Sequence, residues 1–135
     1  PLILVMKIIL FSLLFIVSGM GVAFADPITA QTSSEDKIHF VDEQIMIMAD
    51  ISNNQDTQQN FAYITQVRNN DDVVISLSWL TGSLSPRQSF SPAQSWIPTE
   101  PGTYHIQVYV WESIDNPSAL SPPLSMIVNV SEREI

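Results

Sequence analysis

The side chains that most often carry out chemistry in proteins are sparse in this chain. Its histidines, His39 and His105, fall in separate predicted strands, and no third ligand stands at a metal-binding spacing from them. Cysteine is absent, which excludes thiolate catalysis and metal sites built on cysteine. No serine lies in a Gly-x-Ser-x-Gly motif, and there is no glycine-rich phosphate loop. The sequence therefore predicts a protein that is not an enzyme and that has no metal site and no cofactor.

Thioether sulfurs are the remaining soft ligands. Met46, Met48 and Met126 lie in predicted strands, and methionine thioethers favour copper(I). Methionine also fills gaps in apolar cores. Met126 lies on the predicted inward face of its strand, and Met46 and Met48 alternate with Ile45 and Ile47 on a strand that we expect to be buried on both faces. We therefore expect all three to pack rather than to bind metal.

The best candidates for a binding surface lie in the segment PTEPGTYHIQVYVW at positions 98–111. Apolar residues at every second position, from Tyr104 to Val110, indicate a strand with one buried face. The opposite face carries polar and aromatic residues where a fully solvated strand would carry charge, and tyrosine and tryptophan are enriched at binding hot spots. These candidate partner-binding residues are His105, Gln107, Tyr109 and Trp111. The alternative is that a neighbouring loop covers them, or that they reflect ordinary strand propensity.

One modification motif is present. Asn129 begins Asn-Val-Ser, a glycosylation acceptor with a permitted middle residue, and it alternates outward from Val128 and Val130. Asn129 is therefore a candidate glycosylation site, and an unmodified surface asparagine is the alternative.

Strands are the elements that must position these residues, because the dominant period of the chain after residue 25 is two. Turn-forming prolines, glycines and asparagines separate the apolar runs. Pro92 confines the extended run around it to a sheet edge. The predicted strands cover residues 27–33, 37–41, 44–52, 61–67, 73–80, 104–110 and 124–130.

The order SLSPRQSF, then SW, then PGTYHIQVYV resembles the second half of immunoglobulin-like domains of microbial secreted and surface proteins, including the CARDB and fibronectin-type-III-like groups. The resemblance covers residues 44–130. It implies an all-β fold, a single immunoglobulin-like antiparallel β-sandwich of about seven strands. It also implies a structural corner at Gly102 and Tyr104, with the tyrosine hydroxyl bonded to nearby backbone. We expect Trp79 and Trp96 to lie in the core.

The first 25 residues have the pattern of a signal peptide. Lys7 precedes an apolar run, and Ala23 and Ala25 precede Asp26. We expect cleavage after Ala25, a natural start at Met6, and a mature domain at 26–135. An uncleaved membrane anchor is the alternative.

The chain carries fourteen acidic residues against five lysines and arginines, a net charge of −9. This charge repels nucleic acids and anionic membrane surfaces. We therefore expect a non-catalytic interaction or structural module, secreted or displayed on the outer cell surface, whose partner is an extracellular protein or glycan. The alternative is a small ligand-binding or protease-inhibitor-like domain that acts through loop 82–90, with Leu84 or Arg87 making the contact.

Overall fold

The computed structural model describes residues 26–32 and 38–133. The predicted signal peptide at 1–25, and the choice between cleavage and anchoring, lie outside these residues. Within the two described ranges there is no helix long and apolar enough to cross a membrane.

The described chain forms nine β-strands. The longer strands alternate buried and exposed residues, which is the pattern of strands with one face against a core. The strands are β1 (Ile28–Thr32), β2 (His39–Phe40), β3 (Ile45–Asn53), β4 (Gln59–Arg68), β5 (Val74–Leu84), β6 (Ser89–Phe90), β7 (Ala93–Trp96), β8 (Gly102–Trp111) and β9 (Leu124–Ser131).

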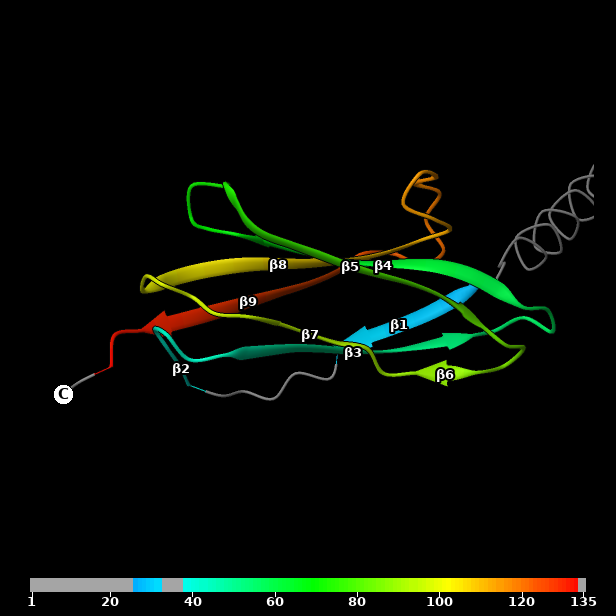
Figure 1. Ribbon diagram of the computed structural model, residues 1–135, viewed down its shortest axis with the longest axis horizontal. Helices are drawn as coiled ribbons and strands as arrows, with labels where there is room; N and C mark the ends of the chain where they lie inside the picture. Colours follow the sequence, from blue (N-terminus) through cyan, green and yellow to red (C-terminus); the bar gives the residue numbers. More distant parts are fainter. Residues whose placement is uncertain (1–25, 33–37, 134–135) are drawn as a thin grey trace, which may run out of the picture.

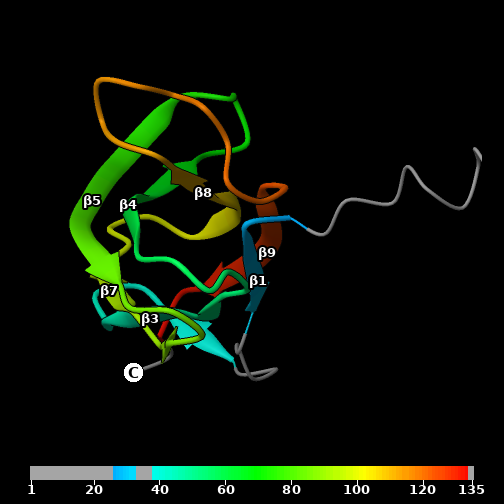
Figure 2. The same ribbon diagram turned by 90° about the vertical axis from the view of Figure 1, so that its right-hand side faces the viewer.

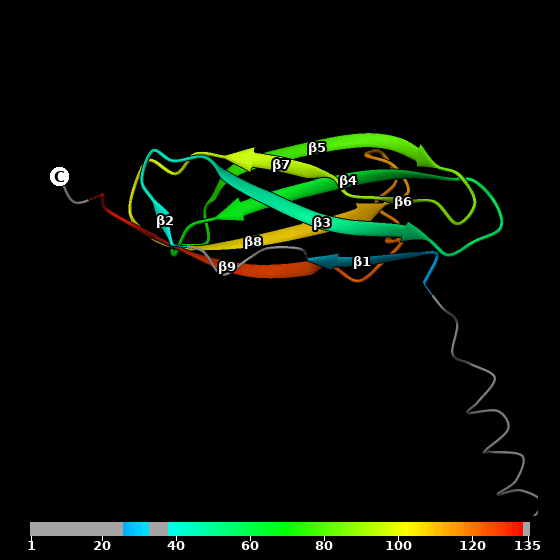
Figure 3. The ribbon, with the colours of Figure 1, turned by 90° about the horizontal axis from the view of Figure 1, so that it is seen from below.

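These strands form two sheets that pack face to face as a sandwich (Figures 1 and 2). In the smaller sheet β3 is central, with β1 on one side and β6 and then β7 on the other. The larger sheet has the order β2-β9-β8-β4-β5. Figure 3 shows the strands of the smaller sheet in front of those of the larger one. The prediction of an all-β immunoglobulin-like sandwich is confirmed.

The core lies between the two sheets. From β3 it receives Ile45, Ile47 and Ile51, and from β8 it receives Ile106 and Val108, all at most 3% exposed. Burying side chains of this size stabilises the fold by about 1.5–3 kcal/mol each. The sandwich is held by this apolar layer, since the chain has no cysteine.

A corner tyrosine ties the entry of β8 to the preceding loop. The Tyr104 hydroxyl donates a 2.6 Å hydrogen bond to the backbone carbonyl of Glu100, four residues upstream. Its ring packs edge to face on Trp96 with centroids 4.6 Å apart. Gly102, which lies between Glu100 and Tyr104 in the sequence, has a φ of 148°, a backbone conformation that favours glycine. Burial is the main reason that the pKa of Tyr104 is raised, and the nearby Glu100 carboxylate adds to it.

Three expectations about individual side chains need correction. Trp96 lies in the core, but Trp79 is 58% exposed, because the register of β5 directs it away from the smaller sheet. Met46 and Met48 are 51% and 37% exposed on the outer face of the smaller sheet, so they do not fill the core. The neighbouring Ile45 and Ile47 point inward instead.

The predicted strand at 73–80 is longer in the structure. β5 continues to Leu84, and only residues 85–88 connect it to β6. The hydrogen bond from the Gln88 amide to the Ser85 carbonyl closes that turn. Leu84 is 1% exposed and belongs to the core.

Candidate binding face

The outer face of the larger sheet brings the four predicted binding residues of β8 together with residues that the sequence did not single out. In an antiparallel sheet, residues directly opposite each other point to the same side. The register therefore defines rows of side chains that run across the sheet. Four such rows cover the outer face, which we call the outer sheet face: Thr81–Ala62–Trp111, Trp79–Ile64–Tyr109, Leu77–Gln66–Gln107–Ser125 and Val74–Arg68–His105–Ile127.

The first two rows form an aromatic end. The rings of Tyr109 and Trp111 lie 5.9 Å apart and are tilted by 46°. Across the sheet, Trp79 stands on the edge strand β5, and Ile64, between Trp79 and Tyr109, is only 7% exposed. Aromatic side chains thus flank Ile64 on both sides within its row, and Trp111 lies in the adjacent row.

The edge strand β5 places polar side chains at inward positions and large apolar side chains at outward positions, the reverse of an ordinary sheet edge. Its inward positions include Ser76 and Ser78, and the Ser78 hydroxyl donates a 2.7 Å hydrogen bond to Oε1 of Gln94 on β7. Its outward positions include Leu77 and Trp79, which are more than half exposed. Because β5 contains no charged residue, nothing on this edge discourages another molecule from binding.

The other two rows form a polar end. A hollow of about 460 Å³ opens there. Its lining includes Arg68, His105, Gln107, Ser125 and Ile127. Arg68 sits at an irregularity of the β4–β5 pair, where Ile75 has no residue opposite it. β-Bulges of this kind redirect side chains and occur next to functional sites.

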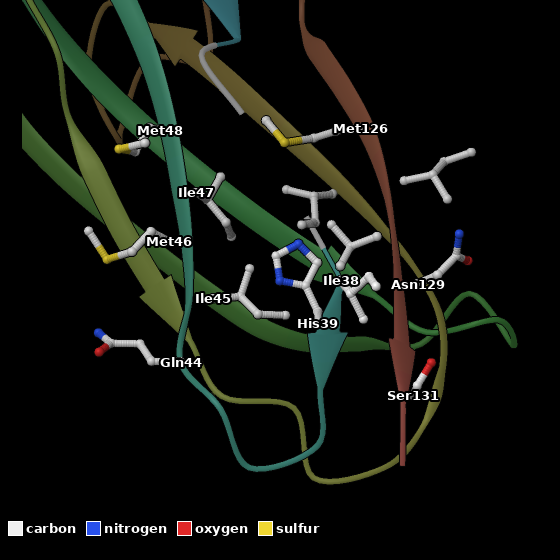
Figure 4. A pocket seen from close by; sticks show the side chains of 13 residues that line it. Ile38, His39, Gln44, Ile45, Met46, Ile47, Met48, Met126, Asn129 and Ser131 are labelled. Carbon is white, nitrogen blue, oxygen red and sulfur yellow. The ribbon is translucent and has the colours of Figure 1, made fainter. Parts of the chain in front are cut away.

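A second hollow lies between β3 of the smaller sheet and β9 of the larger sheet (Figure 4). It has a volume of about 570 Å³ and a mainly aliphatic lining that includes Ile45, Ile47 and Met126, with His39 and Asn129 at its polar positions. The only imidazole near it is that of His39, and none of the described residues form a group of three His, Asp or Glu side chains that could hold a metal ion.

Asn129, the predicted glycosylation site, is exposed on β9. Its Oδ1 accepts a 2.9 Å hydrogen bond from the Thr103 hydroxyl on β8. Modification of Asn129 stays a prediction.

The loop proposed as an inhibitory element does not present its apolar residue. Leu84 is buried, and Arg87 donates a 2.9 Å hydrogen bond to Asp56 on the neighbouring loop. The contact that an inhibitor would make through Leu84 is therefore absent.

Comparison with known proteins identifies the architecture. The crystal structure of a CARDB domain from Pyrococcus furiosus, in complex with di-metal ions, superposes with a TM-score of 0.59 over 77% of this chain and 87% of that one, at 17% identity. The described chain has a CARDB-like immunoglobulin-like fold. A β-glucosidase from Listeria innocua also matches this CARDB-like fold, with a TM-score of 0.62 over 80% of this chain, at 13% identity.

The match to the Listeria β-glucosidase covers only 16% of that protein, and a match to a β-glucuronidase from Bacteroides uniformis covers 13% of it. These matches each concern a single domain of a much larger enzyme. No family model and no curated protein matches the chain. The solved structures therefore show the fold of the described chain, which is that of a CARDB-like domain.

Proposed function

We propose that the protein is a secreted or surface-displayed interaction module that binds an extracellular partner through the outer sheet face. The observation that carries this proposal is the aromatic end of that face, where Trp79 on β5 and Tyr109 and Trp111 on β8 stand on either side of β4. Rigid strands hold these rings in place, so binding costs little conformational entropy. Aromatic side chains of this kind supply most of the binding energy at protein interfaces.

The charge distribution supports the same surface. The chain carries a net charge of −9, but no aspartate or glutamate occurs in the four rows of the outer sheet face. A partner that approaches there avoids burying carboxylates, whose desolvation opposes association. The extracellular address rests on the signal-peptide pattern of residues 1–25.

Affinity capture from the native extracellular fraction tests the proposal. The bait is the tagged protein, compared with Trp79→Ala/Trp111→Ala. The matched control is Met46→Ala/Met48→Ala, which removes exposed apolar side chains from the outer face of the smaller sheet. We expect the tryptophan variant to lose the partner and the methionine variant to keep it. Equal capture by both variants would exclude the outer sheet face.

A further inference from the structure

The polar end of the outer sheet face contains the least satisfied cation of the described chain. Among the described arginines, Arg87 is paired with Asp56 at 2.9 Å and Arg133 is paired with Glu43. Arg68 has only a 3.6 Å contact from Nη1 to Asp72, a carboxylate that is 79% exposed. Its Nε is buried and has no hydrogen-bond partner. The Arg68 side chain is 29% exposed, so its Nη groups are the donors that an anionic ligand in the hollow can reach.

The neighbours of Arg68 complete a set of donors. His105 stands directly opposite it on β8, and Ser125 stands opposite Gln107 in the next row. The Tyr109 hydroxyl donates to Oε1 of Gln107, which orients that amide and leaves its Nε2 group as a donor. Arginine, glutamine and serine together offer N–H and O–H groups to the oxygens of a ligand, and the lining contains no carboxylate that would repel it.

The aromatic end lies close enough for one ligand to reach both ends. Tyr109 is four residues from His105 along β8, which is about 14 Å in an extended strand. This distance suits a ligand of several linked units. Sugar rings fit such a surface, because their C–H faces pack on aromatic rings while their hydroxyl groups hydrogen-bond to glutamine amides.

We propose that the outer sheet face binds an acidic polysaccharide, with a uronic acid carboxylate at Arg68 and neighbouring sugar rings on Trp79, Tyr109 and Trp111. This inference rests on the proposed function and names its ligand class. The net negative charge of the chain opposes such a ligand at long range, but salt screens that repulsion beyond about 8–10 Å. The contact with Arg68 is local and survives this screening.

Calorimetric titration of the purified protein with tetragalacturonate tests the inference, with cellotetraose as the neutral oligosaccharide of equal length. We expect tetragalacturonate to bind more tightly. Arg68→Gln should weaken its binding about 10- to 100-fold, the range for losing hydrogen bonds to a charged group. The matched control Arg87→Gln removes an arginine remote from the hollow and should leave the affinity unchanged.

A substitution with the opposite expected sign separates a binding role from a structural one. Asp72 competes with the ligand for Arg68, so Asp72→Asn should tighten tetragalacturonate binding about two- to fivefold. A general loss of structure would instead weaken binding. Circular dichroism of each variant verifies that the fold is retained.

Three results would overturn the inference. The first is the absence of tetragalacturonate binding, and the second is equal affinity for cellotetraose together with no effect of Arg68→Gln. The third is equal competition by tetraglutamate, which would assign the surface to an acidic peptide. None of these results decides the proposed function, because capture of a native partner that is lost in Trp79→Ala/Trp111→Ala is a separate measurement.

Discussion

Ile64 on β4 lies directly opposite Trp79 on β5, yet Ile64 is 7% exposed and Trp79 is 58% exposed. Both side chains point away from the sandwich core, with Tyr109 on the other side of Ile64. A small apolar layer therefore exists outside the main core, and its aromatic margin remains open to solvent. This arrangement separates residues that stabilise the fold from residues that are free to bind.

Replacing the core tryptophan of β7 should destabilise the protein more than replacing the surface tryptophan of β5. Trp96→Ala removes a 9% exposed ring that packs on Tyr104, and we expect it to lower the free energy of unfolding by about 3–5 kcal/mol. Trp79→Ala should cost less than about 1 kcal/mol, because its ring is mostly in solvent. Urea unfolding measures both. Equal losses would place Trp79 in the core, as the sequence alone had predicted.

A pair of buried tyrosines isolates the contribution of the corner hydrogen bond. Tyr104→Phe removes the bond to the Glu100 carbonyl and should cost about 1–3 kcal/mol. Tyr63 is fully buried, but its hydroxyl has no hydrogen-bond partner, so Tyr63→Phe should change stability by less than about 0.5 kcal/mol. Chemical denaturation of both variants checks this. A Tyr63→Phe variant that is as destabilised as Tyr104→Phe would refute the role of the corner bond.

Adjacent residues of β8 should behave oppositely. Val108 is 1% exposed between the sheets, and Val108→Ala should cost about 1–3 kcal/mol through the cavity it leaves. Gln107 points outward, and Gln107→Ala should stay within about 0.5 kcal/mol. The comparison uses urea midpoints at constant slope. If the Gln107 variant were less stable than the Val108 variant, the inward and outward faces of β8 would be assigned the wrong way round.

Tyr63 should also make stability depend on alkaline pH. Burial raises the pKa of Tyr63 to about 12 from 10.0, with the nearby Thr65 hydroxyl acting in the opposite direction. In the unfolded chain the phenol ionises at lower pH, so its contribution is complete below pH 10 and is lost as the pH rises toward 12. This loss amounts to about 2–3 kcal/mol. Unfolding free energies measured across this range should fall less steeply for Tyr63→Phe, and identical slopes would argue against the shift.

The sequence predicted the fold well because its signals are local. Alternation from Tyr104 to Val110 defines the inward face of β8, and the proline and glycine before it mark the corner. The inward face of β5 was not predictable in this way, since the segment from Val73 to Leu80 carries apolar residues at both odd-numbered and even-numbered positions. Only its register with β4 decides that Trp79 points outward. Arg68 gave no sequence signal either, because its role depends on a neighbour 37 residues away.

The number and length of the strands also depend on pairings that the sequence alone does not show. The sequence predicted about seven strands, and the described residues form nine, because β6 and β7 are two short pairings on either side of Pro92. Proline lacks an amide hydrogen, so it divides an edge strand without ending its path along β3. Likewise, Gly82 permits β5 to continue, since a Cβ there would lie 3.1 Å from the Phe61 ring.

Site-specific photo-crosslinking tests the central claim most directly. A photoreactive phenylalanine analogue replaces Leu77 on the outer sheet face or, as a control of similar exposure, Met46 on the smaller sheet. Each protein is irradiated in the native extracellular fraction. If the outer sheet face is the binding surface, the analogue at position 77 should crosslink to a partner and the analogue at position 46 should not. A partner that is crosslinked only from position 46 would contradict it.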